Sequence, residues 1–161
     1  MSANVVRNFK KNSLYSFIQL NVMTLSSHAK LMCGILLVII PTIEFGGYFL
    51  LRILSGKFDH AGFTEFQKSV FRAGHAHAGV LVILAIICQV LTDEARLGSG
   101  AEWLVRIGLP AAALLISGGF FGSAAGKGAT RPNGMVSLIY AGIFLLALCL
   151  IILAVGLFKA I

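Results

Sequence analysis

Four long hydrophobic runs, separated by short polar segments, dominate the pattern of this chain. The runs cover about residues 31–54, 69–91, 104–125 and 135–158. Each is long enough to supply the roughly 20 mainly apolar residues that an α-helix needs to cross the hydrocarbon core of a bilayer. The pattern therefore predicts an all-α fold, an integral membrane bundle of four antiparallel helices that forms one domain over residues 28–161.

Composition agrees with a membrane protein. Of the 161 residues, 58% are hydrophobic and 12% are charged, and the mean hydropathy is +0.91. The net charge of +7 would suggest a nucleic-acid partner in a soluble protein, but here the basic residues border the apolar runs, where phospholipid headgroups lie. We therefore expect membrane lipid around the chain and no nucleic acid. Three cysteines stand singly inside the runs, and we interpret them as small buried hydrophobic residues: Cys33, Cys88 and Cys149.

Residues 1–27 form a basic tail, which includes Arg7, Lys10 and Lys11. The apolar stretch within it, residues 14–25, is too short and too polar to cross a bilayer, so we expect the tail to lie along the membrane interface. The basic residues of the chain are divided almost evenly between the two sides of the predicted bundle. The positive-inside rule therefore favours neither orientation.

The first run contains an acidic residue, Glu44, between Pro41 and the glycine pair at 46–47. Proline removes a backbone hydrogen bond and glycine removes side-chain bulk, so we expect a kinked helix that another helix or a flat ligand can approach closely. An unpaired acid at the centre of a spanning helix costs roughly 2.5–3.5 kcal/mol. Glu44 is therefore expected to face the protein interior, where it either stabilises the kink through Tyr48 or a freed carbonyl, or contacts a cofactor or substrate.

The second run opens with two histidines, His75 and His77, within the stretch at residues 71–79. Ionisable groups inside a membrane are costly, and a functional role is the default hypothesis for them. A separation of two residues turns the side chains by about 200° on a helix, so these two do not form a chelating pair. His77 shares its face with small residues such as Gly74, and it is either a metal or haem ligand or a hydrogen-bonded packing residue.

The third run is rich in small residues, with Gly118, Gly122 and Gly126 spaced four apart. Such GxxxG units expose one backbone face, which favours packing against a neighbouring helix and also allows contact with a flat cofactor. Helix packing is the more general use of such a face in lipid, and the two uses are compatible.

Antiparallel helices of similar length fix the depth of each residue in the membrane, because each residue adds about 1.5 Å of rise. Counted in this way, Glu44 lies level with His77, and residues 118–122 of the third run and Tyr140 of the fourth run fall in the same half of the bilayer. His28, which precedes the first run, falls at the opposite surface. A single cofactor in one subunit therefore cannot easily contact both His28 and His77.

Four short motifs are spread along most of the chain: His-Ala-Lys-Leu-Met at 28–32, Arg-Ala followed by His-Ala-Gly within 72–79, the aromatic and small residues of 120–123, and Pro-Asn at 132–133. In these motifs the sequence resembles the styrene oxide isomerase family, small four-helix membrane proteins that assemble as trimers and bind haem b between subunits. The resemblance implies a homotrimer and haem b, bound non-covalently because the chain has no C-x-x-C-H attachment motif. We expect an integral protein of the bacterial inner (plasma) membrane.

The resemblance also implies that the histidine heading the second helix is the ligand of the haem iron. His77, which is followed by Ala78 and Gly79, fits this position best, and His75 is the alternative. The other cofactor contacts are expected from small and aromatic residues at a similar depth: Gly74, Gly118, Phe121 and Gly122.

In that family the ferric haem acts as a Lewis acid on an epoxide oxygen, and ring opening followed by a hydride shift gives an aldehyde. The resemblance therefore implies an isomerase that acts on a small hydrophobic epoxide, with polar contacts from Glu44, Asn133 and Tyr140. The family's substrate-holding asparagine, however, falls on Ile83 here, and its tyrosine falls on Phe121. These departures keep a second function open, that of a non-catalytic haem protein in electron transfer, haem handling or gas sensing.

Overall fold

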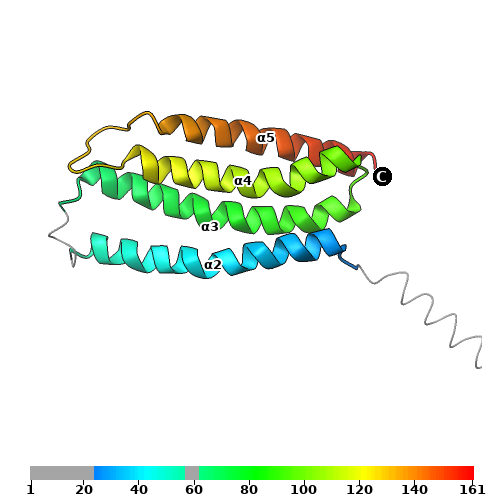
Figure 1. The fold of residues 1–161 in the computed structure, drawn as a ribbon, viewed down its shortest axis with the longest axis horizontal. Coiled ribbons are helices and arrows are strands. Elements are labelled where there is room, and N and C mark those ends of the chain that lie inside the picture. Colours follow the sequence, from blue (N-terminus) through cyan, green and yellow to red (C-terminus); the bar gives the residue numbers. More distant parts are fainter. Residues whose placement is uncertain (1–23, 57–61) are drawn as a thin grey trace, which may run out of the picture.

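The computed structural model describes residues 24–56 and 62–161. Four helices follow one another in these residues, labelled as in Figure 1: α2 (Ser27–Leu54), α3 (Glu65–Glu94), α4 (Ser99–Ser123) and α5 (Val136–Phe158). All four are long and apolar enough to cross a membrane. The prediction of an all-α bundle with four such helices is therefore confirmed, whereas the predicted interfacial tail lies almost wholly outside the described residues.

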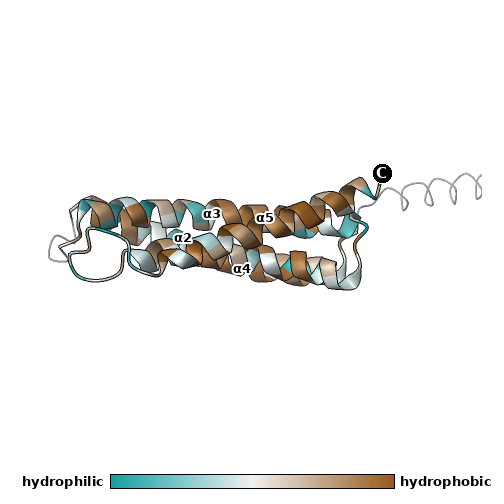
Figure 2. Cartoon of the chain, turned by 90° about the horizontal axis from the view of Figure 1, so that it is seen from above, coloured by the Kyte–Doolittle hydropathy of each residue, from teal (hydrophilic) through white to brown (hydrophobic). Residues whose placement is uncertain are grey.

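The helices lie side by side in chain order, from α2 through α3 and α4 to α5 (Figure 1). α3 packs between α2 and α4, and α4 packs between α3 and α5. In the most apolar stretch of each helix, 50% of the residues of α4 are buried, against 11% in α2 and 17% in α5. The outer helices therefore leave most of their apolar surface on the outside of the bundle, as expected for helices that face lipid. Figure 2 shows hydrophobic residues along the middle of the bundle and polar residues mainly toward its two ends.

Side-chain caps explain why helices begin before the hydrophobic runs do. α2 starts after Ser26, whose hydroxyl accepts a hydrogen bond from the backbone nitrogen of Ala29 at 3.1 Å. α3 starts after Thr64, which forms a capping box with Gln67: each side chain accepts a hydrogen bond from the other residue's backbone nitrogen at 3.1 Å. A capped helix can include a polar first turn, so α3 begins at Glu65 rather than near residue 69.

Two prolines lie inside helices, Pro41 in α2 and Pro110 in α4. Pro110 has no N–H group, so the carbonyl of Arg106 loses its usual partner in the next turn. The buried side chain of Gln89, in α3, donates a hydrogen bond through Nε2 to this carbonyl at 2.8 Å. This bond joins α3 to α4 and satisfies a backbone group that lipid could not satisfy. α2 continues through Pro41 as a single helix.

The close packing of α4 on α5 depends on glycine, but not on the set that the sequence predicted. A Cβ atom on Gly119 would lie 2.7 Å from Cγ1 of Ile139 and 2.8 Å from its backbone nitrogen, so glycine is required. Gly118 faces open space, and Gly126 follows the end of α4 at Ser123, with a φ of +114°. The predicted GxxxG unit that includes Gly126 is therefore wrong, because α4 ends before this residue. Gly118 contacts no neighbour within the described residues, so a contact at this position stays a prediction.

The cysteines behave largely as predicted. Cys88 and Cys149 are buried in the main hydrophobic core, together with residues such as Leu36 and Leu109. Cys33 is only half-buried, and all three thiols are free. The core therefore uses two of the three cysteines as small apolar side chains.

Candidate functional site

His77 lies on the outer surface of α3. Its Nδ1 atom is 2.7 Å from the carbonyl oxygen of Ala73, one turn earlier in the helix. A carbonyl oxygen only accepts, so Nδ1 carries the proton and, in the neutral ring, Nε2 carries the lone pair. The ring stacks on that of Phe120, in α4, with centroids 4.8 Å apart. His77 is thus a fixed imidazole whose Nε2 has no hydrogen-bond partner among the described residues.

His75 lies on a different face of α3, as the helical spacing predicted, and packs against α2. A Cβ atom on Gly47 would lie 2.9 Å from Nε2 of His75, so this nitrogen rests against the α2 backbone. The ring also lines a cavity of about 350 Å³, whose other walls are almost entirely apolar: Gly46, Phe49, Leu50, Ile53, Phe63, Phe71, Phe121 and Ala125. The two histidines therefore have different surroundings: His75 is packed against α2, whereas His77 is exposed.

Two of the glycines expected to contact a cofactor are covered by side chains of the same chain. A Cβ atom on Gly74 would lie 3.0 Å from Cβ of Phe120 and 3.1 Å from the ring of Phe121, so the two phenylalanines cover this glycine. Gly122 is covered by the side chain of Met135. The sequence identified correctly that these positions need small residues. Within one subunit, however, the space is filled by side chains of α4 and of the segment before α5.

The predicted depths are confirmed, and the predicted orientation of Glu44 is wrong. Residues 46–47 of α2 contact His75, and the two helices are antiparallel, so Glu44 lies about level with His77. His77 contacts Phe120 of α4, and the neighbouring Gly119 contacts Ile139 of α5, so Tyr140 lies at a similar depth. Yet Glu44 is exposed on the surface of the bundle, and Tyr140 is 68% exposed.

Tyr48, the partner that the sequence offered to Glu44, forms no hydrogen bond with it in the described part of the chain. Tyr48 lies under the guanidinium group of Arg52, 6.0 Å from ring centroid to Cζ. No hydrogen bond or ion pair joins Glu44 to another residue in the described part of the chain. The carboxyl group thus points away from the protein interior, because the face of α2 that packs on α3 is occupied by glycines and aliphatic residues.

Asn133 is exposed, and its side chain joins two segments of the backbone. Its Nδ2 atom donates to the carbonyl of Gly122, at the end of α4, and its Oδ1 atom accepts from the backbone nitrogen of Met135, both at 2.9 Å. Its backbone nitrogen donates to the carbonyl of Ser123 at 2.9 Å. The amide therefore ties the end of α4 to the start of α5, and its contact with a substrate stays a prediction.

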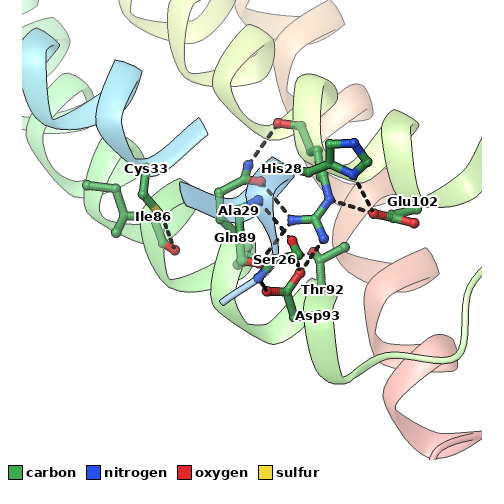
Figure 3. A network of polar contacts seen from close by, with 11 residues as sticks. Ser26, His28, Ala29, Cys33, Ile86, Gln89, Thr92, Asp93 and Glu102 are labelled. Atoms are coloured by element: carbon green, nitrogen blue, oxygen red, sulfur yellow. Dashed lines mark hydrogen bonds and ion pairs between the residues drawn. The ribbon is translucent and has the colours of Figure 1, made fainter. Parts of the chain in front are cut away.

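A buried polar cluster, which the sequence interpretation missed, lies at the opposite end of the bundle (Figure 3). Its centre is Arg106, only 1% exposed, which forms ion pairs with Glu102 at 2.9 Å and with Asp93. Nη1 of Arg106 also donates to the backbone carbonyl of Gln89 at 3.2 Å. The available signal was the spacing of Glu102 and Arg106, four residues apart at the start of an apolar run.

The same cluster fastens the start of α2. Ser26 donates to Asp93 through both its backbone nitrogen and its hydroxyl, each at 2.7 Å. His28 lies 3.7 Å from Glu102 and stacks on Trp103, with ring centroids 4.7 Å apart. Three helices therefore meet in one charged network, with His28 at the surface opposite His77, as the depth count predicted.

A metal ion and a haem iron need different numbers of protein ligands, and the described residues meet only the second requirement. No group of three His, Cys, Asp or Glu side chains in residues 24–56 and 62–161 is placed to hold a metal ion. A haem iron needs fewer protein ligands, because a single histidine and a flat apolar surface suffice. His77 fits this requirement, with an open Nε2 beside an aromatic ring. His75 could serve only if α2 moved, since its Nε2 rests against Gly47.

Comparison of the chain with family models, with curated proteins and with solved structures found no match in any of the three. The function of the chain is therefore inferred from the geometry of His77 and its surroundings, together with the sequence motifs.

Proposed function

We propose that this chain is a haem b-binding integral membrane protein in which Nε2 of His77 is the ligand of the iron. The observation that carries the proposal is the 2.7 Å hydrogen bond from Nδ1 of His77 to the carbonyl of Ala73. Histidines that ligate metals almost always donate their other ring N–H to a carboxylate, a backbone carbonyl or water, which fixes the tautomer and the ring orientation. His77 has this arrangement, and its second nitrogen is directed away from its own helix.

The alternative for His77 is a packing residue that uses its ring only for hydrogen bonds and contacts. A packing histidine in a membrane is expected to be enclosed by protein, with both nitrogens satisfied. His77 is exposed, and only Nδ1 has a partner within the described residues. The open nitrogen therefore favours the ligand over the packing residue.

A homotrimer completes the proposal, because a haem on the surface of α3 needs a second apolar wall. Two exposed polar residues at the depth of His77, Glu44 and Tyr140, would also gain protein surroundings from neighbouring subunits. An uncovered acid in the middle of the bilayer costs roughly 2.5–3.5 kcal/mol, which a subunit contact would reduce. The exposed face of α2, which carries Glu44, is thus the expected contact surface.

The activity implied by the family resemblance is isomerisation of a small hydrophobic epoxide to an aldehyde. The iron would supply a Lewis acid for the epoxide oxygen. Phe120 and the neighbouring apolar side chains would give the iron surroundings poor in water, and this would limit hydrolysis to a diol.

A specific observation favours the second candidate, a non-catalytic haem protein. Phe121, which stands where the family has a tyrosine, stacks with Phe71 at 5.8 Å and offers no hydrogen bond to a substrate. Ile83, which stands where the family has an asparagine, is likewise apolar. Haem binding is therefore the primary proposal, and electron transfer, haem handling or gas sensing competes with catalysis.

The proposal is tested by replacing His77 with a smaller residue in the full-length protein. His77→Ala should abolish the Soret absorption of the purified protein, and added imidazole should restore it by occupying the vacated position. His28→Ala, at the other end of the bundle, is the matched control and should keep the absorption of the wild type. Loss of the Soret band in His75→Ala, with the band retained in His77→Ala, would show that the wrong histidine has been assigned.

A further inference from the structure

A second cavity, of about 170 Å³, lies between α2, α3 and α4. Its walls are mainly apolar and include Leu36 and Ile43 of α2, Val82 of α3 and Ala113 of α4. The cavity extends to the surface of the bundle, because Leu114, which also lines it, is 67% exposed. None of its lining residues belongs to the proposed haem site.

One polar side chain in this cavity has no partner. Ser117 is 8% exposed, and its hydroxyl makes no hydrogen bond within the described part of the chain. A serine inside a helix often donates to the carbonyl four residues earlier, which here belongs to Ala113, but this bond is absent. Buried polar atoms are nearly always hydrogen-bonded, so an unpaired hydroxyl on a serine that lines a cavity suggests a bound molecule.

We propose that this cavity binds a small apolar molecule that carries one oxygen atom, and that Ser117 forms a hydrogen bond with this oxygen. The volume suits such a ligand, because an apolar cavity of about 150 Å³ is large enough to hold benzene. A single hydroxyl among apolar walls can recognise one oxygen, as in an aromatic alcohol, ketone or epoxide. Charged molecules are excluded, since no ionisable side chain lines the cavity.

The hydroxyl of Thr42 strengthens this assignment. Thr42 lines the same cavity, and its hydroxyl donates a hydrogen bond to the carbonyl of Ile39 at 2.6 Å. This hydroxyl therefore has no hydrogen left to donate to a ligand. Ser117 is then the hydroxyl donor still free in the described walls, and the ligand oxygen is its acceptor. A lipid acyl chain could fill the apolar space but would leave Ser117 unpaired. A water molecule would pair with Ser117 but would leave the apolar walls uncovered.

The test compares two probes that differ by one oxygen, 4-fluorobenzyl alcohol and 4-fluorotoluene, bound to the full-length protein in lipid nanodiscs and followed by fluorine NMR. Ser117→Ala should weaken binding of the alcohol about two- to tenfold, the value of one neutral hydrogen bond, and leave binding of 4-fluorotoluene unchanged. Ser137→Ala is the matched control, because it removes an exposed hydroxyl on α5. Partition of the probes into lipid is common to all variants and cancels in the comparison.

A second variant tests the cavity itself without touching the hydroxyl. Ala78→Leu should fill the space and abolish binding of both probes, whereas Gly79→Ala, at a position with no atom within 4 Å, should preserve it. Binding of the alcohol that is equal in wild type and Ser117→Ala would overturn the role of the serine. Binding that survives Ala78→Leu, or a wild-type protein that binds neither probe, would overturn the cavity as a binding site. None of these outcomes depends on haem.

Discussion

The hydrogen bond from Gln89 to the carbonyl of Arg106 gives the sharpest prediction about stability. Gln89 is fully buried, and its Nε2 atom donates at 2.8 Å to a carbonyl that Pro110 leaves without a backbone partner. Gln89→Leu keeps a side chain of similar size but removes this donor, together with the Oε1 atom that accepts a longer hydrogen bond from Arg106 Nη1 at 3.4 Å. The donation from Arg106 Nη1 to the backbone carbonyl of Gln89 remains in the variant, because it does not use the glutamine side chain.

The expected cost follows from leaving one buried carbonyl unsatisfied. Such a group costs about 1–3 kcal/mol in proteins, while hydrogen bonds between membrane helices average about 0.6 kcal/mol and reach about 1.7 kcal/mol. We therefore expect Gln89→Leu to lower the free energy of unfolding by about 1–2 kcal/mol. The assay is reversible unfolding in mixed micelles of increasing SDS content, followed by circular dichroism.

A second substitution tests whether the unsatisfied carbonyl of Arg106 causes this loss of stability. Pro110→Ala restores an N–H group that can donate to the carbonyl of Arg106 within α4, so Gln89→Leu should cost much less in this background. The double-mutant cycle should give a coupling of about 1 kcal/mol. If Gln89→Leu is equally destabilising with proline and with alanine at position 110, the carbonyl of Arg106 is not what the glutamine stabilises.

Three further predictions concern packing, the α4–α5 connection and assembly. Gly119→Ala should destabilise the protein by about 1–3 kcal/mol, because the added methyl group meets the backbone of Ile139. Gly118→Ala, at a position that faces open space, should not destabilise it, and equal effects of the two variants in thermal unfolding would refute this prediction. Asn133→Ala removes two hydrogen bonds at the end of α4 and should cost about 1 kcal/mol in the same measurement, with no loss meaning that solvent replaces them. Native mass spectrometry should show a homotrimer that Glu44→Lys dissociates, and a wild-type monomer that retains haem would exclude the proposed interface.

The number, type and depth of the helices could be predicted from the sequence, because hydrophobic length alone determines which segments can cross a bilayer. Depth was also predictable, since antiparallel helices of equal rise align by counting, and Glu44 does lie level with His77. The rotation of each helix about its own axis could not be predicted. A spanning helix exposes apolar residues to lipid as well as to its neighbours, so the hydrophobic pattern of α2 could not show that Glu44 lies on the exposed face.

The parts of the site that the sequence missed depend on contacts between distant residues. The sequence pattern assigned no role to Arg106, which is buried and pairs with Asp93 of another helix. Ser117 looked like one more small residue of the third helix, and only the packing of α2 and α3 around it creates the cavity. The separation of His75 and His77 on different faces was predictable, because it follows from helical geometry alone.

The absorption spectrum of the purified full-length protein, oxidised and then reduced, tests haem binding most directly. The proposal predicts a Soret band that shifts on reduction, about one haem per subunit, and loss of the pigment on denaturation and extraction because the attachment is non-covalent. His77→Ala produced in the same cells should lack the band while keeping its helical circular dichroism. A wild-type protein without a Soret band, even after hemin is added, would contradict haem binding and with it both functions that depend on the iron.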